Sequence, residues 1–101
     1  MKELTIQNFD QNISSGLILV DFWAERCGPC RMLSPVLEGL SQKIEGVQFS
    51  KVNIDEEQEL ASRYGIMSIP TVMIFKDGQL VDKVIWLNPE NVYQSKLEDL
   101  K

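Results

Sequence analysis

A mostly apolar run from Leu17 to Trp23 is the feature that most restricts how this chain can fold. Its apolar side chains alternate onto both faces of an extended segment, and Asp21 is the only charged residue within it. A strand that is apolar on both faces belongs in the middle of a sheet covered by helices on both sides. The run therefore predicts a layered α/β domain built around this strand.

Glycine, proline and asparagine divide the rest of the chain into short elements of alternating period. The expected strands are Leu4–Gln7, Leu17–Trp23, Val47–Ile54, Thr71–Phe75 and Leu80–Ile85. Lys76 to Gln79 contains Asp77-Gly78, which is typical of a hairpin turn between the last two strands. The order predicts a central mixed sheet that is mainly parallel in its first half, with an antiparallel hairpin at the edge.

Four helices are expected between and after these strands. The first is a short helix opened by a capping box at Asn8 and Gln11, and it buries Phe9 and Ile13. The second is long, and its apolar residues at helical spacing are Leu33, Val36, Leu37, Leu40 and Ile44; the third is short and is marked by Leu60, Ala61 and Tyr64. The last helix starts at Asn88-Pro89 and carries Tyr93, Leu97 and Leu100 on one face. Gly46 and Gly65 stand where left-handed C-caps are expected.

Length and composition restrict the function classes further. The 101 residues are expected to form one domain, 1–101, which leaves no room for a second lobe with its own cofactor site. No stretch is long and apolar enough for a membrane helix, and the first residues lack the apolar core of a signal peptide, so we expect a cytoplasmic protein. The net charge of −5 argues against a nucleic-acid partner.

Cys27 and Cys30, the only two cysteines, directly follow the central strand at the start of the long helix. Residues at i and i+3 on a helix lie on the same side, so the two sulfurs are close enough to form a disulfide that opens and closes. The unpaired N–H groups and the positive dipole end of a helix start favour the thiolate of Cys27. This pattern predicts redox chemistry.

Two other interpretations of the cysteine pair fit less well. A structural zinc site needs two further thiolate or imidazole ligands, and the chain has no histidine and no third cysteine, so the metal would have to be shared between two chains. A purely structural disulfide closing a four-residue loop would constrain the unfolded chain very little.

The segment Val20 to Cys30 has the sequence Val-Asp-Phe-Trp-Ala-Glu-Arg-Cys-Gly-Pro-Cys. Together with several later motifs it makes the chain resemble the thioredoxin family, and the resemblance covers essentially the whole chain. These motifs are Pro35, Asn53-Ile54-Asp55, Ile69-Pro70-Thr71 and Lys76-Asp77-Gly78. The resemblance implies the thioredoxin fold and a protein-disulfide reductase without a cofactor of its own. It also implies a monomer whose partners are a flavin-containing thioredoxin reductase, NADPH-dependent or using another donor, and disulfide-containing target proteins.

The resemblance assigns roles to individual residues. Cys27 would be the exposed nucleophile that forms a mixed disulfide with the target, and the more buried Cys30 would resolve it. Pro29 would stiffen the loop. Pro70 would be a cis-proline that places the backbone of Ile69 beside the sulfurs to pair with an extended substrate, the alternative being a trans proline at a strand entry. The implied substrate-binding residues are Trp23, Arg26, Gly28, Pro29, Ile69, Pro70 and Trp86.

Asp21 is expected to be buried, because it shares a strand face with Leu17, Leu19 and Trp23. A buried carboxylate is costly without a task or a partner. Asp21 and Lys51 match a buried Asp and Lys pair of the family, whose implied role is to accept the proton of Cys30. A merely structural ion pair is the alternative.

Two positions depart from the family pattern. Arg26 stands where the family usually carries a tryptophan before the first cysteine, and Trp86 stands for the small glycine usually found after the last strand. The two changes either move one aromatic ring across the docking surface or reflect neutral drift, and they bear on partner choice and reductase affinity. Met32, Met67 and Met73 are expected to fill the core and its rim.

Two rival functions share this fold. A thiol oxidant or isomerase would tend to carry a polar or basic residue between the cysteines in place of Gly28-Pro29. A binding subunit without redox turnover would not need the intact dithiol.

Overall fold

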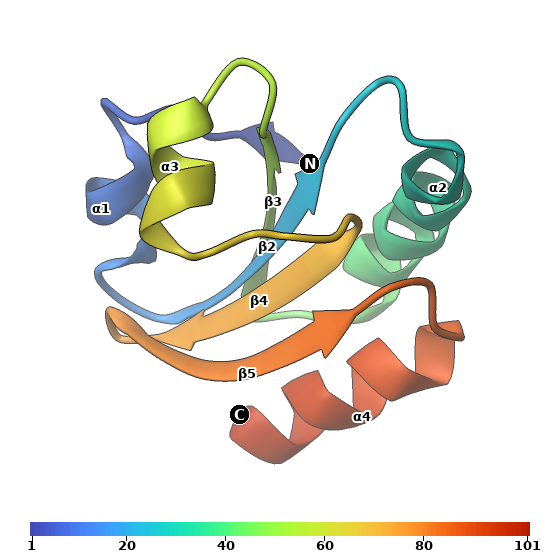
Figure 1. Cartoon of the computed structure of the whole chain (residues 1–101). Coiled ribbons are helices and arrows are strands. Elements are labelled where there is room, and N and C mark those ends of the chain that lie inside the picture. The colour runs from blue at the N-terminus through green and yellow to red at the C-terminus, as the bar shows by residue number, and fades with distance from the viewer.

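The apolar run Leu17–Trp23 forms β2, the middle strand of a five-stranded sheet (Figure 1). The computed structural model describes residues 1–101 and gives the strand order β1-β3-β2-β4-β5. The other strands are β1 (Lys2–Glu3), β3 (Val47–Asn53), β4 (Thr71–Lys76) and β5 (Gln79–Ile85). The helices are α1 (Phe9–Ile13), α2 (Gly28–Lys43), α3 (Gln58–Arg63) and α4 (Glu90–Leu100). The predicted order of elements is confirmed.

The sheet is mixed, as predicted. β3 is parallel to both β2 and β1, whereas β4 is antiparallel to β2 and to β5. Six of the seven residues of β2 are buried, which is what a strand apolar on both faces requires. In this register Asp21 lies between Lys51 of β3 and Val72 of β4.

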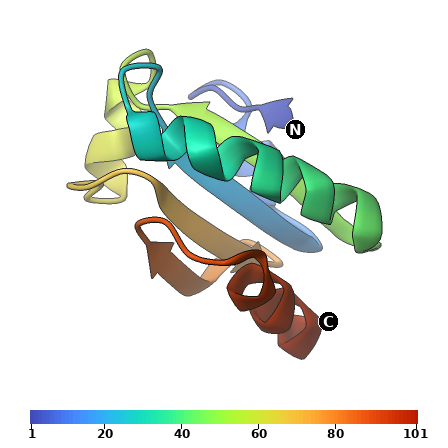
Figure 2. The ribbon, with the colours of Figure 1, turned by 90° about the vertical axis from the view of Figure 1, so that its right-hand side faces the viewer.

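Helices cover both faces of the sheet: α2 and α4 lie on the face turned to the viewer in Figure 2, and α1 and α3 lie on the opposite side (Figure 1). On one face α2 and α4 pack over a buried cluster of Leu17, Leu19, Leu33, Leu37, Leu40, Ile44, Phe49, Val72, Ile74, Val84, Tyr93 and Leu97. On the other face α1 and α3 pack over Leu4, Phe9, Ile13, Ile18, Val20, Phe22, Val52, Leu60, Met73 and Phe75. The alternation along β2 sends successive side chains into opposite layers, so this single strand supplies both cores.

The hairpin between β4 and β5 has the predicted two-residue turn. Asp77 and Gly78 have φ of +49° and +89°, the left-handed pair that makes the turn twist with its strands. The Asp77 carboxylate accepts a 2.8 Å hydrogen bond from the Gly16 N–H, which ties the turn to the start of β2. Asp-Gly is favoured here because both residues tolerate positive φ.

Two local predictions near the N-terminus are wrong. The first strand is Lys2–Glu3, not Leu4–Gln7, and the chain turns directly afterwards. Asn8 does precede α1, but its side chain makes no helix cap and instead accepts a 2.8 Å hydrogen bond from the Thr5 N–H. That bond stabilises the turn before α1, and the turn competes with an extended strand.

Two helix boundaries also differ from the prediction. α2 ends at Lys43 with extended Ile44 as its C-cap, so the left-handed Gly46, with φ of +79°, belongs to the connection to β3. Pro89 has an extended ψ of 155° and is the N-cap of α4 rather than its first helical residue. The proline ring restricts only φ, so it leaves the helix free to begin one residue later.

Candidate active site

The two cysteines lie at the carboxyl end of β2, where the chain enters α2. Cys27 is the N-cap of α2, Gly28 and Pro29 are its first two residues, and Cys30 follows within the first turn. The two cysteines form a disulfide. The Cys30 N–H donates a 3.2 Å hydrogen bond to Cys27 Sγ, so a backbone donor of the helix start points at the first sulfur. The predicted placement of the pair is confirmed.

The two sulfurs differ less in exposure than the resemblance implies. Cys27 is 9% exposed and Cys30 is 1% exposed. Cys27 is thus the more accessible of the two, but it is largely covered in the disulfide form. Ala24 and the partly buried Trp23, Ile54 and Ile69 pack around the pair.

Pro70 lies beside the disulfide although it is 40 residues further along the chain than Cys30. The Ile69–Pro70 peptide bond is cis, which removes the trans alternative. The Ile69 carbonyl oxygen is 3.8 Å from Cys27 Sγ. The backbone of Ile69 therefore borders the sulfur of Cys27.

Asp21 is buried as predicted, with 1% of its surface exposed. Burial raises the pKa of its carboxyl from the ordinary 3.8 to about 7, and the positive charge of Lys51 acts in the opposite direction. Lys51 is the neighbour of Asp21 in the sheet, but no ion pair within 4.0 Å joins them. The Lys51 ammonium instead lies 4.8 Å from the centre of the Trp23 ring. The structural ion pair is therefore not formed.

Two buried polar atoms at this place have no hydrogen-bond partner. They are Oδ1 of Asp21 and Nε1 of Trp23, two residues apart on the same face of β2. An unpaired carboxylate oxygen in the core is costly, and the cost falls on the charged form. Asp21 is thus a group that exchanges its proton near neutral pH.

Arg26 directly precedes Cys27, but its charge is not free. Its Nε and Nη2 each lie 3.1 Å from an oxygen of Asp55, which makes a two-pronged ion pair. In the sequence Asp55 stands out only as part of the motif Asn53-Ile54-Asp55, and its contact with Arg26 was not predicted. The available signal was that β2 and β3 are parallel neighbours, so the loops after them meet at one edge of the sheet.

Trp86 follows β5 and is 53% exposed. Its φ is +74°, in the left-handed region that favours glycine and is uncommon for a bulky residue. Its N–H donates a 2.8 Å hydrogen bond to the Pro70 carbonyl, and its own carbonyl accepts a bond of 3.4 Å from the Tyr93 hydroxyl. The loop that carries Trp86 is thereby tied to the segment beside the disulfide.

The family model for thioredoxin matches residues 1–99. The chain is 47% identical over 91 residues to the thioredoxin of Chlamydia caviae, a match that covers 90% of this chain and 89% of the relative. It is 51% identical over 87 residues to the thioredoxin of Chlamydia pneumoniae, a match that covers 86% of this chain and 85% of the relative. The chain belongs to the thioredoxin family.

Solved thioredoxin structures agree with this assignment over the whole fold. A Plasmodium falciparum thioredoxin superposes with a TM-score of 0.92 at 34% identity and covers 100% of both chains. Oxidized mitochondrial thioredoxin 3 of Saccharomyces cerevisiae gives a TM-score of 0.90 at 33% identity over 98% of this chain and 94% of that one. With its Cys27–Cys30 disulfide, this thioredoxin-family member is a thiol–disulfide oxidoreductase acting on protein disulfides.

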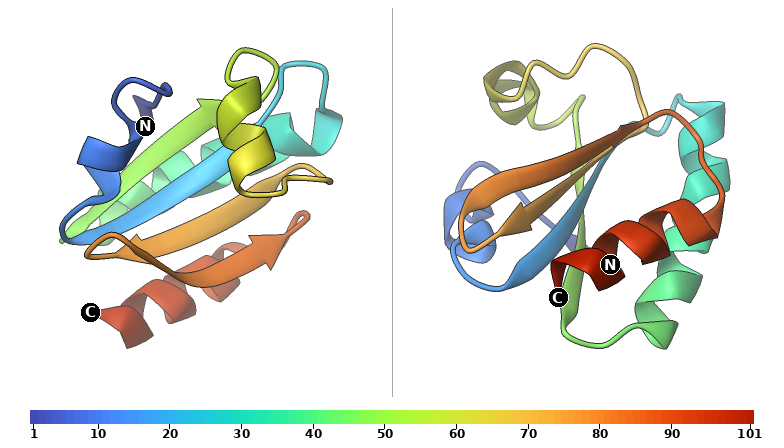
Figure 3. Two further views of the ribbon diagram at one scale, coloured as in Figure 1. Left: turned by 60° about the vertical axis from the view of Figure 1, so that its left-hand side comes forward. Right: turned by 90° about the horizontal axis from the view of Figure 1, so that it is seen from below.

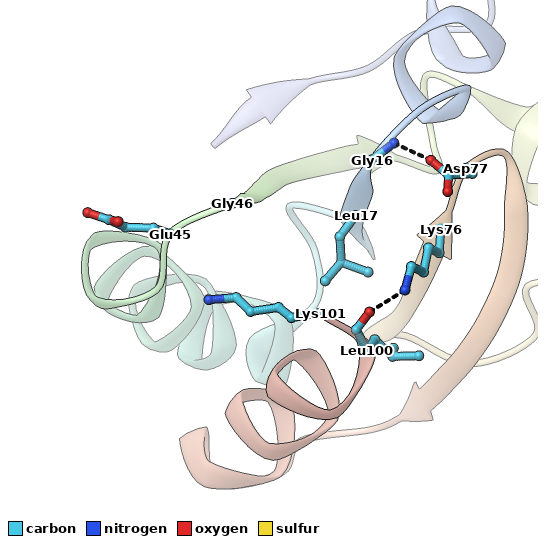
Figure 4. A pocket seen from close by; sticks show the side chains of 8 residues that line it. All are labelled: Gly16, Leu17, Glu45, Gly46, Lys76, Asp77, Leu100 and Lys101. Atoms are coloured by element: carbon cyan, nitrogen blue, oxygen red, sulfur yellow. Dashed lines mark hydrogen bonds between the residues drawn. The ribbon is translucent and has the colours of Figure 1, made fainter.

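Two hollows mark the surface of this family member. The larger, about 500 Å³, lies at the far end of the sheet from the disulfide, between the start of β2, the end of β4 and the end of α4 (Figure 4). Lys76 in its wall donates a 2.7 Å hydrogen bond to the Leu100 carbonyl. The smaller, about 180 Å³, opens beside the segment that precedes Pro70.

The three methionines expected to fill the core or its rim differ in their surroundings. Met73 is 2% exposed and fills the core as predicted. Met32 and Met67 are 63% and 96% exposed, so the prediction that they fill the core or its rim is wrong for both.

None of the helices has the length and apolar composition needed to cross a membrane.

Proposed function

We propose that the protein works as a reductant of disulfides in other proteins, with Cys27 as the nucleophile. The Cys27 thiolate attacks one sulfur of the target disulfide, and the other target sulfur leaves as a thiolate. The Cys30 thiolate then attacks Cys27 Sγ, and the second target sulfur leaves. Two electrons pass to the target, whose thiolates take up two protons, and the protein is left as its Cys27–Cys30 disulfide.

The observation that carries this proposal is the placement of the two sulfurs. Cys27 caps the helix, lies 3.8 Å from the Ile69 carbonyl oxygen and is the more accessible cysteine, whereas Cys30 is only 1% exposed. A target sulfur therefore reaches Cys27 first, and Cys30 is held within bonding distance to complete the reaction.

Asp21 serves in this proposal as the proton acceptor for Cys30. Its pKa of about 7 means that it gives and takes a proton near neutral pH, which is where a general base is most effective. Lys51, its neighbour in β3, keeps that pKa from rising further through its positive charge. Asp21 and Lys51 would thus act on the second step, when the Cys30 thiolate is needed.

The docking surface in this proposal surrounds the disulfide. The backbone of Ile69 pairs with an extended target segment, with Pro70 directly behind it. Further contacts come from Trp23, Arg26, Gly28, Pro29 and Trp86. The protein would act as a single domain, 1–101, and as a monomer in the cytoplasm, where a reducing environment suits a catalytic cysteine pair. A flavin-containing thioredoxin reductase, using NADPH or another donor, would restore the dithiol.

Insulin reduction with dithiothreitol as donor tests the assignment of the two cysteines. We expect the unaltered protein to accelerate the reaction, Cys27→Ser to abolish it, and Cys30→Ser to accumulate a mixed disulfide with the target, visible by mass spectrometry. A mixed disulfide formed by Cys27→Ser instead would reverse the roles. Equilibration against glutathione of known ratio separates a reductant from an oxidant, because about 30 mV corresponds to about 1.4 kcal/mol for this couple.

A further inference from the structure

The hollow of about 180 Å³ beside Pro70 is a feature that the reaction at the two cysteines does not use. It lies between the segment that follows α3 and the edge strand β5. Five of its nine lining residues are hydrophobic, namely Tyr64, Ile66, Met67, Met73 and Ile85, and Ser68, Thr71 and Lys83 are the polar ones. Lys83 is the only charged one among the residues lining it, so the hollow is mainly apolar.

The hollow borders the place where every target has to bind. Met67 precedes Ile69 by two residues, and the Ile69 carbonyl oxygen is 3.8 Å from Cys27 Sγ. Ile85 precedes Trp86, whose N–H bonds to the Pro70 carbonyl. Two residues of chain span at most about 7 Å, so Met67 on the rim lies within about 7 Å, along the backbone, of Ile69 beside Cys27.

Its apolar rim is open to solvent. Met67 is 96% exposed and Ile85 is 51% exposed. The core cluster under α1 and α3 draws residues from β2, β3 and β4 but none from β5. Figure 3 (left) shows the same arrangement, with α3 over the middle of the sheet and β5 uncovered on that side. The face of β5 beside the disulfide is thus available to another chain.

The volume selects what the hollow can hold. Pockets for drug-sized ligands measure about 300–1,000 Å³, which is larger than this one. A single large side chain is the matching occupant. Because most of its lining residues are hydrophobic, an apolar side chain gains from burial there, whereas a polar one loses part of its hydration.

We propose that this hollow is a specificity subsite for the target chain, which receives an apolar side chain two or three residues from the cysteine under attack. The spacing follows from the chain length between Met67 and Ile69, which an extended target segment alongside would match. The inference rests on the proposed function, since it takes Cys27 as the point of attack. Met67 and Ile85 are the residues that read the target side chain.

A peptide series tests the subsite. Each peptide carries one cysteine in a mixed disulfide with the chromogenic thiol thionitrobenzoate, and either leucine or serine at one of the three positions on each side. Reduced protein in excess turns the peptide disulfide into free peptide thiol and thionitrobenzoate, and becomes oxidised itself. Rates are divided by those with dithiothreitol, which has no binding surface. We expect leucine to react about fivefold faster than serine at one or two positions two or three residues from the cysteine.

Variants locate the origin of that preference. Met67→Gln and Ile85→Thr should each reduce the leucine preference to less than about twofold and leave the rate with the serine peptides unchanged. Val81→Thr is the matched control, because Val81 is also on β5 and 41% exposed but does not line the hollow, so this variant should keep the preference. Equal rates for leucine and serine at all positions, or a preference that survives both Met67→Gln and Ile85→Thr, would overturn the proposal.

Insulin reduction by the same preparations separates this proposal from the proposed function. A protein that reduces insulin but shows no leucine preference contradicts the subsite alone. If insulin reduction fails as well, the redox assignment fails, and the subsite is then tested by NMR. The protein is titrated with peptides that carry serine in place of cysteine, and the chemical shift of the Met67 methyl group is followed. A shift with the leucine peptide but not with the serine peptide supports the subsite, and no shift with either overturns it.

Discussion

Asp21 has a pKa of about 7 in the folded protein, against an ordinary value of 3.8. Between these two values the folded state holds a proton that the unfolded state has released. The free energy of unfolding therefore falls as pH rises through this window. The cost of burying the Asp21 charge is absent below about pH 4, and its full size, about 4 kcal/mol for a difference of about three pKa units, is reached above about pH 7.

We expect Asp21→Asn to raise the free energy of unfolding by up to about 4 kcal/mol at about pH 8 and to leave it nearly unchanged at about pH 4. The amide removes the charge whose burial is unfavourable, although the loss of the carboxylate also removes the attraction to Lys51. Urea titrations at the two pH values measure the difference.

The same variant should slow disulfide reduction if Asp21 accepts the proton of Cys30. Reduction rates measured between about pH 6 and pH 9 on Asp21→Asn and unaltered protein provide the check, with dithiothreitol as donor for both. A stability gain of the same size at both pH values would contradict the burial argument. Unchanged rates over the whole range would remove Asp21 from the mechanism.

Trp86 combines an unfavourable backbone conformation with an exposed indole. A residue with a Cβ at φ of +74° costs about 1–2 kcal/mol relative to its normal conformation. Such strain persists only where the surroundings hold it, and here three hydrogen bonds of the Trp86 backbone, to Pro70 and from Asn88 and Tyr93, do so.

Replacing Trp86 with glycine should leave stability unchanged or raise it by up to about 1 kcal/mol, because glycine removes the strain but adds freedom to the unfolded chain. Trp86 is 53% exposed, so only part of its indole packs against the protein. Urea unfolding measures stability, and the KM for a protein target measures docking, which should weaken. A loss of more than about 1 kcal/mol would mean that indole packing outweighs the strain.

At the scale of the elements, the ion pair of Arg26 and Asp55 joins the loop after β2 to the loop after β3. The Asp55 backbone is itself held, because its N–H donates a 3.0 Å hydrogen bond to the Asn53 side chain. Both charged side chains are at least half exposed, so solvent screens their attraction. The pair therefore orders the loop before Cys27 more than it stabilises the fold.

A double-mutant cycle with Arg26→Gln and Asp55→Asn should give a coupling energy of about 0.2–1 kcal/mol at low salt. In about 1 M salt, where the Debye length falls to about 3 Å, the coupling should disappear. Urea unfolding of the four proteins under both conditions measures it. A coupling that persists at high salt would assign the contact to geometry rather than to charge.

The elements also show where local sequence rules hold and where they fail. Long or strongly patterned elements such as β2 and α2 were predicted within a residue or two, since their apolar spacing reports the buried face directly. Short elements contain too few residues to show such a pattern. Asn8 fits a capping box by its spacing from Gln11, yet its side-chain oxygen accepts a hydrogen bond from the Thr5 N–H. The first strand has only two residues, so a turn follows it directly, and bonding within this turn replaces the helix cap.

At the scale of the molecule, the disulfide joins residues only three positions apart, while two core clusters hold the sheet from both sides. Chain entropy predicts that closing so short a loop stabilises the folded state by only about 2 kcal/mol, the low end of what disulfides contribute. We expect the reduced protein to remain folded and to be less stable than the oxidised one by about that amount. Urea unfolding with and without a phosphine reductant checks this, and unfolding on reduction would contradict it.

The sequence by itself determined the α/β class, the order of elements, the cysteine pair at the helix start and the burial of Asp21. These properties follow from periodicity and from the position of residues along one element, which neighbouring residues alone can express. The resemblance to a family added the cis-proline, which no local pattern specifies.

Only the tertiary structure decided which distant residues meet. It placed Asp55 on Arg26, turned Lys51 toward Trp23 instead of into an ion pair with Asp21, and brought Met67 and Ile85 together around one hollow. Each of these contacts joins segments from different strands or loops, and its geometry depends on sheet register and on how the helices pack. Register and packing are collective properties of the fold, so the energies that set these contacts cannot be assigned to any single stretch of sequence.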